Sequence, residues 1–272
     1  MLKTKNDDIS GRKFLERLER LRPIDDEFMR CIFRDNIPLA QMVLRILTGK
    51  PDLVVTRLET QKDFKRLAGA RSVCLDAYCV DDQGKVYDIE VQRSRYGAGS
   101  HRARYHSSSM DIENLGEGES FESLPDTYTI FITEEDLYQY GKPFYEIERV
   151  LVNTGDYRSF EDGAHILYVN ASYRDDSQFG RLMHDFCCSS PGEMKLPLMQ
   201  EAARYYKETR EGSETMSTVF EEILNEGIEK GREITQISNI KALQEKLNLS
   251  VVEAMDALKI PDSERKALMK LL

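Results

Sequence analysis

The sequence predicts a fold of both helices and strands, followed by a helical C-terminal tail, and three observations support this prediction. Apolar residues recur at helical spacing in residues 25–34 and 39–47, and a further helix is expected over residues 100–113. Apolar-rich runs typical of strands occupy residues 53–58, 72–92, 128–133 and 166–170. Beyond about residue 180 the helical pattern returns and persists. We therefore expect one domain over residues 1–212 and a helical tail over residues 213–272.

The tail has its own local signals. Gly227 and Gly231 lie four residues apart in the long polar stretch 214–247, a pattern that indicates a weak helix. Two short helices are expected after it, one behind the capping-box pattern Ser250-Val251-Val252-Glu253 and one that starts at Pro261-Asp262. They could pack together or against a partner through Val252, Met255, Leu258, Leu268 and Leu271.

Composition and cysteine usage indicate a globular protein of a reducing compartment. Of the 272 residues, 40% are apolar and 32% are charged, which is typical of a folded chain with a real core. No stretch approaches the roughly 18 uninterrupted apolar residues of a membrane helix, and the first residues lack the apolar segment of a secretion signal. The five cysteines show no CxxC spacing, so free thiols are expected. We therefore expect a cytoplasmic protein without a membrane segment.

The net charge of −10 conceals an uneven distribution. Residues 93–110 contain four arginines, two histidines and no acid, whereas residues 111–162 contain fourteen acids and three bases. Binding to phosphate depends on the local field, so the basic segment is a candidate contact surface. An ordinary solvated loop would account for the same charges.

Residues 72–92 carry the most informative pattern, a hairpin with acidic side chains. Two apolar-rich runs flank a polar turn at residues 81–85, which contains a glycine. Because side chains alternate along a strand, one face of the second run holds three apolar or aromatic residues. The other face holds Asp88, Glu90 and Gln92.

The register of this hairpin decides what its acidic residues can do. Pairing of Val80 with Val86 would place Asp76 opposite Glu90, with their Cβ atoms about 5 Å apart. Like charges at that distance destabilise a sheet unless a bound cation or a shifted pKa offsets the repulsion. A slip by two residues would separate the pair, and a polar, solvent-facing strand is the alternative interpretation. Asp76 favours a site, because a charge is unexpected inside the apolar run of residues 73–80.

The spacing of these acids resembles a known nuclease signature. Asp76, followed fourteen residues later by Glu90-Val91-Gln92, resembles the Asp…Glu-x-Lys signature of PD-(D/E)XK nucleases, in the variant with Gln in the third position. More specifically, the chain resembles the PD-(D/E)XK nuclease family transposases, also called the recombination-promoting nuclease family. Similar segments occur between about residues 20 and 225, namely Asp26-Glu27-Phe28-Met29-Arg30-Cys31-Ile32-Phe33, Arg102-Ala103-Arg104-Tyr105, Gly118-Glu119-Ser120-Phe121-Glu122-Ser123-Leu124-Pro125 and Gly180-Arg181-Leu182-Met183-His184-Asp185-Phe186.

This resemblance implies an α/β fold, a restriction-endonuclease-like core with a mixed central sheet flanked by helices. It also implies hydrolysis of DNA phosphodiester bonds with Mg²⁺ or Mn²⁺, for which Asp76 and Glu90 would be the metal ligands. Such an ion polarises the phosphate and lowers the pKa of the attacking water. Gln92 would position that water or a phosphate oxygen, and it offers a dipole where lysine would offer a charge.

Further site residues follow from the same resemblance. Asp26 is the candidate acid of the opening helix, and its neighbours Asp25 and Glu27 are alternatives. Apart from the resemblance, His101 and His106 are side chains that could act as a general base. Packing and surface ion pairs are alternative roles for the candidate DNA contacts, which are Arg93, Arg95, Arg102, Arg104 and Tyr105.

Two functions are therefore expected. The first is a metal-dependent DNA endonuclease, linked to a mobile element or to recombination, with DNA as its partner. The alternative is a weakly active or inactive nuclease-fold protein that binds DNA and assembles through its helical tail, as a homo-oligomer or with another partner. The acidic pair favours the first, whereas the tail and Gln92 favour the second.

Overall fold

The computed structural model describes residues 5–64, 73–153 and 155–272, without the side chains of residues 5–11, Arg95 and Tyr96. The α-helices in this part of the chain are α1 (Lys5–Arg20), α2 (Asp26–Phe33), α3 (Ile37–Thr48), α4 (Ser100–Glu113), α5 (Gln178–Cys187), α6 (Pro197–Glu208), α7 (Arg210–Leu247), α8 (Val251–Ala257) and α9 (Asp262–Met269). The strands are β1 (Val55–Phe64), β2 (Val73–Asp81), β3 (Val86–Gln92), β4 (Thr127–Thr133), β5 (Phe144–Ile147), β6 (Val150–Leu151), β7 (Arg158–Ser159) and β8 (Ala164–Asn170). Short 3₁₀ helices lie at Arg95–Ala98, Phe121–Ser123 and Pro191–Glu193.

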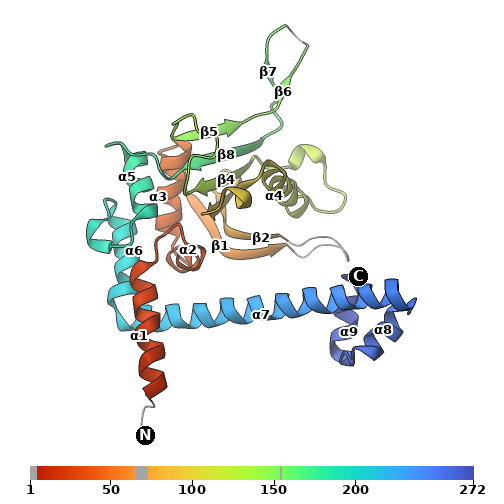
Figure 1. Ribbon diagram of the computed structural model, residues 1–272. Coiled ribbons are helices and arrows are strands. Elements are labelled where there is room, and N and C mark those ends of the chain that lie inside the picture. Colours follow the sequence, from red (N-terminus) through yellow and green to blue (C-terminus); the bar gives the residue numbers. More distant parts are fainter. Residues whose placement is uncertain (1–4, 65–72, 154) are drawn as a thin grey trace. The chain divides into compact units, whose positions relative to one another are not determined.

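Six strands form one mixed sheet in the order β1-β2-β3-β4-β8-β5 (Figure 1). The first three strands are antiparallel neighbours, β3, β4 and β8 run parallel, and β5 returns antiparallel to β8. Strands β6 and β7 form a separate two-stranded ribbon. The α/β class and the mixed central sheet flanked by helices confirm the prediction from the sequence.

Helices cover both faces of this sheet. On one face Tyr87 of β3 stacks on Tyr128 of β4, and Lys50, which follows α3, lies over the Tyr128 ring. The other face of β3 carries Asp88 and Glu90, which contact side chains of α4. Both carboxylates are fully buried. The interpretation of this strand face as solvent-facing is therefore wrong, because α4 packs over it.

Most elements lie where the sequence predicts them, and the differences have physical reasons. Helix α4 covers the expected residues, whereas β1 extends beyond residue 58 to Phe64. This extension was not predicted, because the middle residues of β1 are only partly buried and show no alternation of apolar residues. Helix α1 and the strands β5, β6 and β7 were not predicted from the sequence, because α1 is strongly polar and these strands are largely exposed. Helix α7 is continuous through Gly227 and Gly231.

Contacts between residues divide the chain into two compact units. The first comprises Met1–Phe64 and Val73–Ser217, and the second includes Thr218–Leu272. In the second unit α7, α8 and α9 share a small core that contains Ile240, Met255 and Leu268. The expected capping box is present, because the Ser250 side chain accepts from the Glu253 amide while the Glu253 carboxylate accepts from the Ser250 amide. None of the described helices combines the length and the apolar character required to span a bilayer.

The start of α2 is held in place by contacts to distant segments. The Ile24 amide donates to the Phe186 carbonyl at the end of α5, over 3.0 Å. Asp25 accepts from the Arg22 amide and forms ion pairs with the Arg22 and Arg93 side chains. Asp26, the first residue of α2, is thereby fixed near the edge of the sheet where β2 and β3 carry their acidic residues.

Candidate active site

The hairpin of β2 and β3 changes its hydrogen bonding at its acidic residues. The backbone ladder has the predicted register, with Val80 opposite Val86, and it runs as far as Ala77 and Ile89. One residue further, side chains take over. The Asp76 amide donates to Glu90 Oε1 over 3.0 Å, and the Val91 amide donates to Asp76 Oδ2 over 3.2 Å. The two carboxylates thus lie between the strands, each held by a backbone N–H of the other strand.

Burial makes both carboxylates hold protons more tightly than usual. Burial, followed by the charges of Asp26 and Asp88, raises the pKa of Asp76 to about 7. Burial, followed by the charges of Asp88 and Asp76, raises the pKa of Glu90 well above its ordinary value. Negative charge is therefore costly here, and a cation at this position would be favoured. The charge of Asp76 is among the causes that raise the pKa of Glu90, but burial is the largest cause for both carboxylates.

Asp76 opens onto a pocket of about 470 Å³. Asp26 lines the same pocket and is close enough for its charge to raise the pKa of Asp76. Asp25 and Glu27 also line it, but Asp25 is paired with two arginines and Glu27 is paired with Arg17. Of the three acids considered for the opening helix, Asp26 is thus the one whose charge raises the pKa of Asp76.

Gln61 joins this site from β1, although no sequence signal identifies it. Its backbone has a φ of 55°, a conformation that non-glycine residues rarely adopt. From there its Nε2 donates to Asp76 Oδ1 over 3.3 Å, and its Oε1 accepts from the Cys74 thiol. Gln61 therefore holds the oxygen of Asp76 that does not contact Val91.

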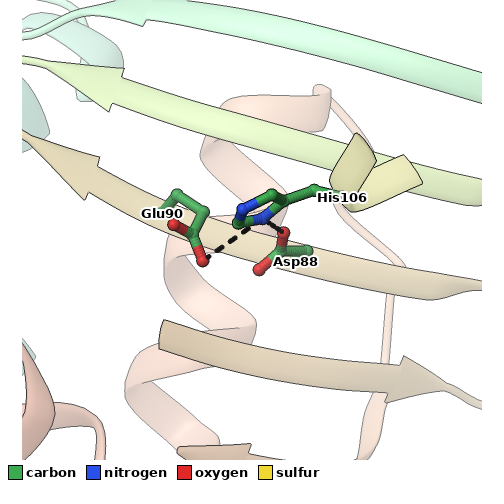
Figure 2. Close-up of side chains that lie close together, drawn as sticks. All are labelled: Asp88, Glu90 and His106. Atoms are coloured by element: carbon green, nitrogen blue, oxygen red, sulfur yellow. Dashed lines mark hydrogen bonds and ion pairs between the residues drawn. The ribbon is translucent and has the colours of Figure 1, made fainter. Parts of the chain in front are cut away.

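Helix α4 supplies a hydrogen-bonded network behind Glu90. Arg102 Nη2 donates to Glu90 Oε2 over 2.9 Å, and Arg102 Nε donates to His106 Nε2 over 3.2 Å. Figure 2 shows the His106 ring beside Asp88 and Glu90, with Nδ1 at 3.1 Å from Asp88 Oδ2 and 3.7 Å from Glu90 Oε1. Arg102 and His106 are four residues apart, so they share one face of the helix.

The hydrogen bonds also fix the role of His106. Since Nε2 accepts from Arg102, the ring proton lies on Nδ1 and is donated to Asp88. Both ring nitrogens are engaged, and the ring is buried. Asp88, Glu90 and His106 are near enough to share a metal ion, but in this arrangement His106 has no lone pair to offer. A second, more exposed cluster of this kind contains Glu146, Glu148 and His165.

Gln92 packs closely against Gly97, in the 3₁₀ helix that leads to α4. A Cβ atom at Gly97 would lie 1.9 Å from Gln92 Oε1, which is far inside contact distance. The Gly97 carbonyl accepts from Arg102 Nη1 over 3.0 Å. Because Gly97 has no side chain, the Gln92 side chain can lie against it. The Gly97 carbonyl also holds Arg102.

We expect Gly97→Ala to move Gln92 without unfolding the protein. The added methyl group meets the flexible end of a side chain, so the fold should lose about 1 kcal/mol at most. DNA cleavage should fall roughly tenfold or more, because Gln92 can no longer occupy its place beside Asp76. Gly99→Ala is the matched control, since a Cβ at Gly99 meets nothing within 4 Å. Equal cleavage rates for the two variants would contradict a role of Gln92 placement.

The other predicted DNA contacts are dispersed. Arg93 and Arg102 line the pocket with Asp76, whereas Arg104 and Tyr105 are not among its described lining residues. Arg104 is exposed, and Tyr105 packs against an apolar cluster around Phe64, Tyr78 and Met110. The side chain of Arg95 lies outside the described residues.

A basic group that the sequence analysis missed lies beside this pocket. A neighbouring pocket of about 590 Å³ shares Asp25, Glu27 and Arg93 with the first. Helix α1 lines it with Lys13, Arg17 and Arg20. Their spacing of four and three residues, which is typical of one face of a helix, would have been the signal.

Comparison with protein families agrees with this geometry. A family model described as PD-(D/E)XK nuclease family transposase matches residues 39–175, half of the chain. The chain belongs to the PD-(D/E)XK nuclease family transposases. The match includes Asp76, Glu90 and Gln92 and is narrower than the predicted span of about residues 20–225, so it leaves out Asp26. Searches of the curated proteins and of the solved structures each found no match.

PD-(D/E)XK nucleases generally use divalent metal ions, and the residues of this site fit such an ion. Asp76 and Glu90 present carboxylate oxygens from adjacent strands, and oxygen is the ligand that Mg²⁺ prefers. Within the described chain, Oδ1 of the neighbouring Asp88 is buried without a hydrogen-bond partner. An excess of buried carboxylate oxygen is thus present where a cation would be stabilised.

Proposed function

We propose that this protein is a metal-dependent DNA endonuclease linked to a mobile element or to recombination. The observation that carries the proposal is the interlocked pair of Asp76 and Glu90, of which Asp76 lines a pocket that Asp26 also lines. Membership in a nuclease family supports DNA phosphodiesters as the substrate.

In this proposal the side chains divide the work. Asp76 and Glu90 would hold a divalent ion, with Asp26 adding negative charge from α2. A bound Mg²⁺ or Mn²⁺ would polarise the phosphate and lower the pKa of the attacking water. Gln92 orients that water or a phosphate oxygen through its amide. Arg93 and Arg102, which line the same pocket, face the phosphate backbone.

The test is cleavage of supercoiled plasmid DNA by the purified full-length chain. We expect nicked or linear product with Mg²⁺ or Mn²⁺ and none with EDTA. Equal cleavage with EDTA would point to a contaminant or to metal-independent chemistry. Absence of cleavage under all ions, with DNA still bound, would favour a binding protein built on a nuclease fold.

A second proposal concerns assembly through the tail, with a second copy of the chain as the partner. Helix α7 exposes Leu224, Ile228 and Ile234, and Gly227 and Gly231 between them have open space where a Cβ would lie. Leu224, Gly227, Gly231 and Ile234 follow one another at spacings of three, four and three residues, which is typical of a seam between two helices, and Ile228 lies beside this seam. Pairing through this seam would bring two nuclease sites together for cuts in both strands.

We expect Ile228→Glu to shift the protein to a monomer if the seam forms. Sedimentation equilibrium measures the mass of the full chain before and after the substitution. Asn225→Glu, at an exposed polar position on another face of the same helix, serves as the control. A wild-type protein that sediments as a monomer at all concentrations would exclude this assembly.

A further inference from the structure

Arg102 lies where a metal ion in the pocket would approach the Glu90 carboxylate. Glu90 is fully buried, and it is not among the described residues that line the pocket. Arg102 does line the pocket, and its side chain is 40% exposed. Its Nη2 contacts Glu90 Oε2, while Glu90 Oε1 faces the Asp76 amide. The guanidinium therefore lies between the pocket and one carboxylate oxygen of the proposed metal site.

The local charges explain why a cation is held there. Asp76, Asp88 and Glu90 are buried side by side, and Asp26 adds a fourth carboxylate at the pocket wall. The positive charge of Arg102 stabilises the ionised forms of Glu90 and Asp88. A divalent ion at Glu90 would satisfy the same negative charge more completely, because it carries two charges and takes several oxygen ligands.

Arg102 is built to leave Glu90 without leaving the site. Its other contacts are neutral, since Nε donates to His106 and Nη1 donates to the Gly97 carbonyl. His106 is itself buried and held by Asp88. The guanidinium is planar and rigid, so it leaves Glu90, His106 and Gly97 together. Rotation about the side-chain bonds then turns it toward the open pocket that Arg102 already lines.

We propose that Arg102 is a displaceable cation that occupies Glu90 in the metal-free protein and turns to a substrate phosphate when a divalent ion takes this carboxylate. The inference rests on the proposed nuclease function and adds a competition between a side chain and the metal. His106 and Gly97 are the positioning groups that hold the arginine against Glu90 in the metal-free protein. Arg102 thereby supplies the positive charge that Gln92 lacks.

Metal affinity without DNA tests the competition. Titration calorimetry with Mn²⁺ compares the full-length wild type with Arg102→Gln and Arg102→Lys. We expect Arg102→Gln to bind Mn²⁺ about tenfold more tightly than the wild type and to bind DNA more weakly in Ca²⁺. Arg102→Lys should tighten Mn²⁺ binding by a smaller factor, because lysine keeps the charge but has no fork to bridge His106 and Glu90.

Control variants distinguish a specific competition at Glu90 from a general effect of removing one positive charge. The outcomes also distinguish failure of this inference from failure of the proposed function. Arg104→Gln removes the same charge from an exposed position of α4 and should leave Mn²⁺ affinity unchanged. Circular dichroism establishes that each variant is folded. Wild-type protein that binds Mn²⁺ while Arg102→Gln binds it equally or more weakly would overturn the competition alone. Wild-type protein that binds no Mn²⁺ would instead overturn the metal site and the proposed function.

Discussion

Glu90→Gln and Asp76→Asn are each expected to lower metal-dependent DNA cleavage by about three orders of magnitude. Each substitution removes one negative charge and one ligand oxygen from the proposed metal site, a loss of about 4 kcal/mol in transition-state stabilisation. Both replacements keep the size of the side chain and one oxygen that can accept the backbone N–H of Asp76 or Val91. Plasmid nicking rates at saturating Mn²⁺ measure the effect.

A carboxylate elsewhere in the same hairpin provides the control. Asp82 lies in the turn between β2 and β3 and is exposed, so Asp82→Asn changes the net charge equally without touching the pocket. We expect its nicking rate to remain within about twofold of the wild type, as is usual for surface substitutions. If the Asp76 and Glu90 variants also cut at the wild-type rate, the metal ligands are other residues.

In metal-free protein, Asp76→Asn is expected to stabilise the fold at pH 8. The pKa of Asp76 is raised to about 7, from an ordinary value of 3.8. Between those values the folded protein binds a proton that the unfolded chain releases, so stability is lost as the pH rises toward 7. Asparagine does not ionise and avoids this loss. The difference should be roughly 2–4 kcal/mol at pH 8 and small at pH 4, since one pKa unit corresponds to about 1.4 kcal/mol.

Thermal unfolding in EDTA at pH 4 and pH 8 measures this difference. We expect the variant to melt several degrees above the wild type at pH 8, with nearly equal melting temperatures at pH 4. Adding Mn²⁺ at pH 8 should raise the melting temperature of the wild type more than that of the variant, because a ligand stabilises the state that binds it. A stability difference between the variant and the wild type that is the same at both pH values would show that the pKa of Asp76 is not raised in the folded protein.

The hairpin shows how much of the site local sequence can determine. A polar turn between two apolar runs fixes the register, and the register brings Asp76 to Glu90. The alternation of faces likewise predicts that Asp88 lies beside Glu90. Whether that face meets solvent depends on α4, which packs over it from beyond the hairpin. For this reason the burial of Asp88 and Glu90 was not determined by the pattern alone.

Residues that act through tertiary contacts could not be identified in the same way. Gln61 reaches Asp76 from an unusual backbone conformation in a neighbouring strand. Gly97 matters because a side chain five residues earlier rests on it. Arg102 and His106 share a helix face by their spacing, but only the packing of α4 shows that this face meets Glu90. Each of these roles depends on a contact with no local periodicity.

The most direct test of the account is the position of a manganese ion in crystals of the full-length protein. Anomalous scattering after growth with Mn²⁺ locates the ion independently of activity. We predict a peak within coordination distance of both Asp76 and Glu90, about 2.0–2.2 Å from their oxygens, with the Arg102 guanidinium turned away from Glu90. A peak at Glu146, Glu148 and His165 alone, or a fully occupied ion that lacks Asp76 as a ligand, would contradict it.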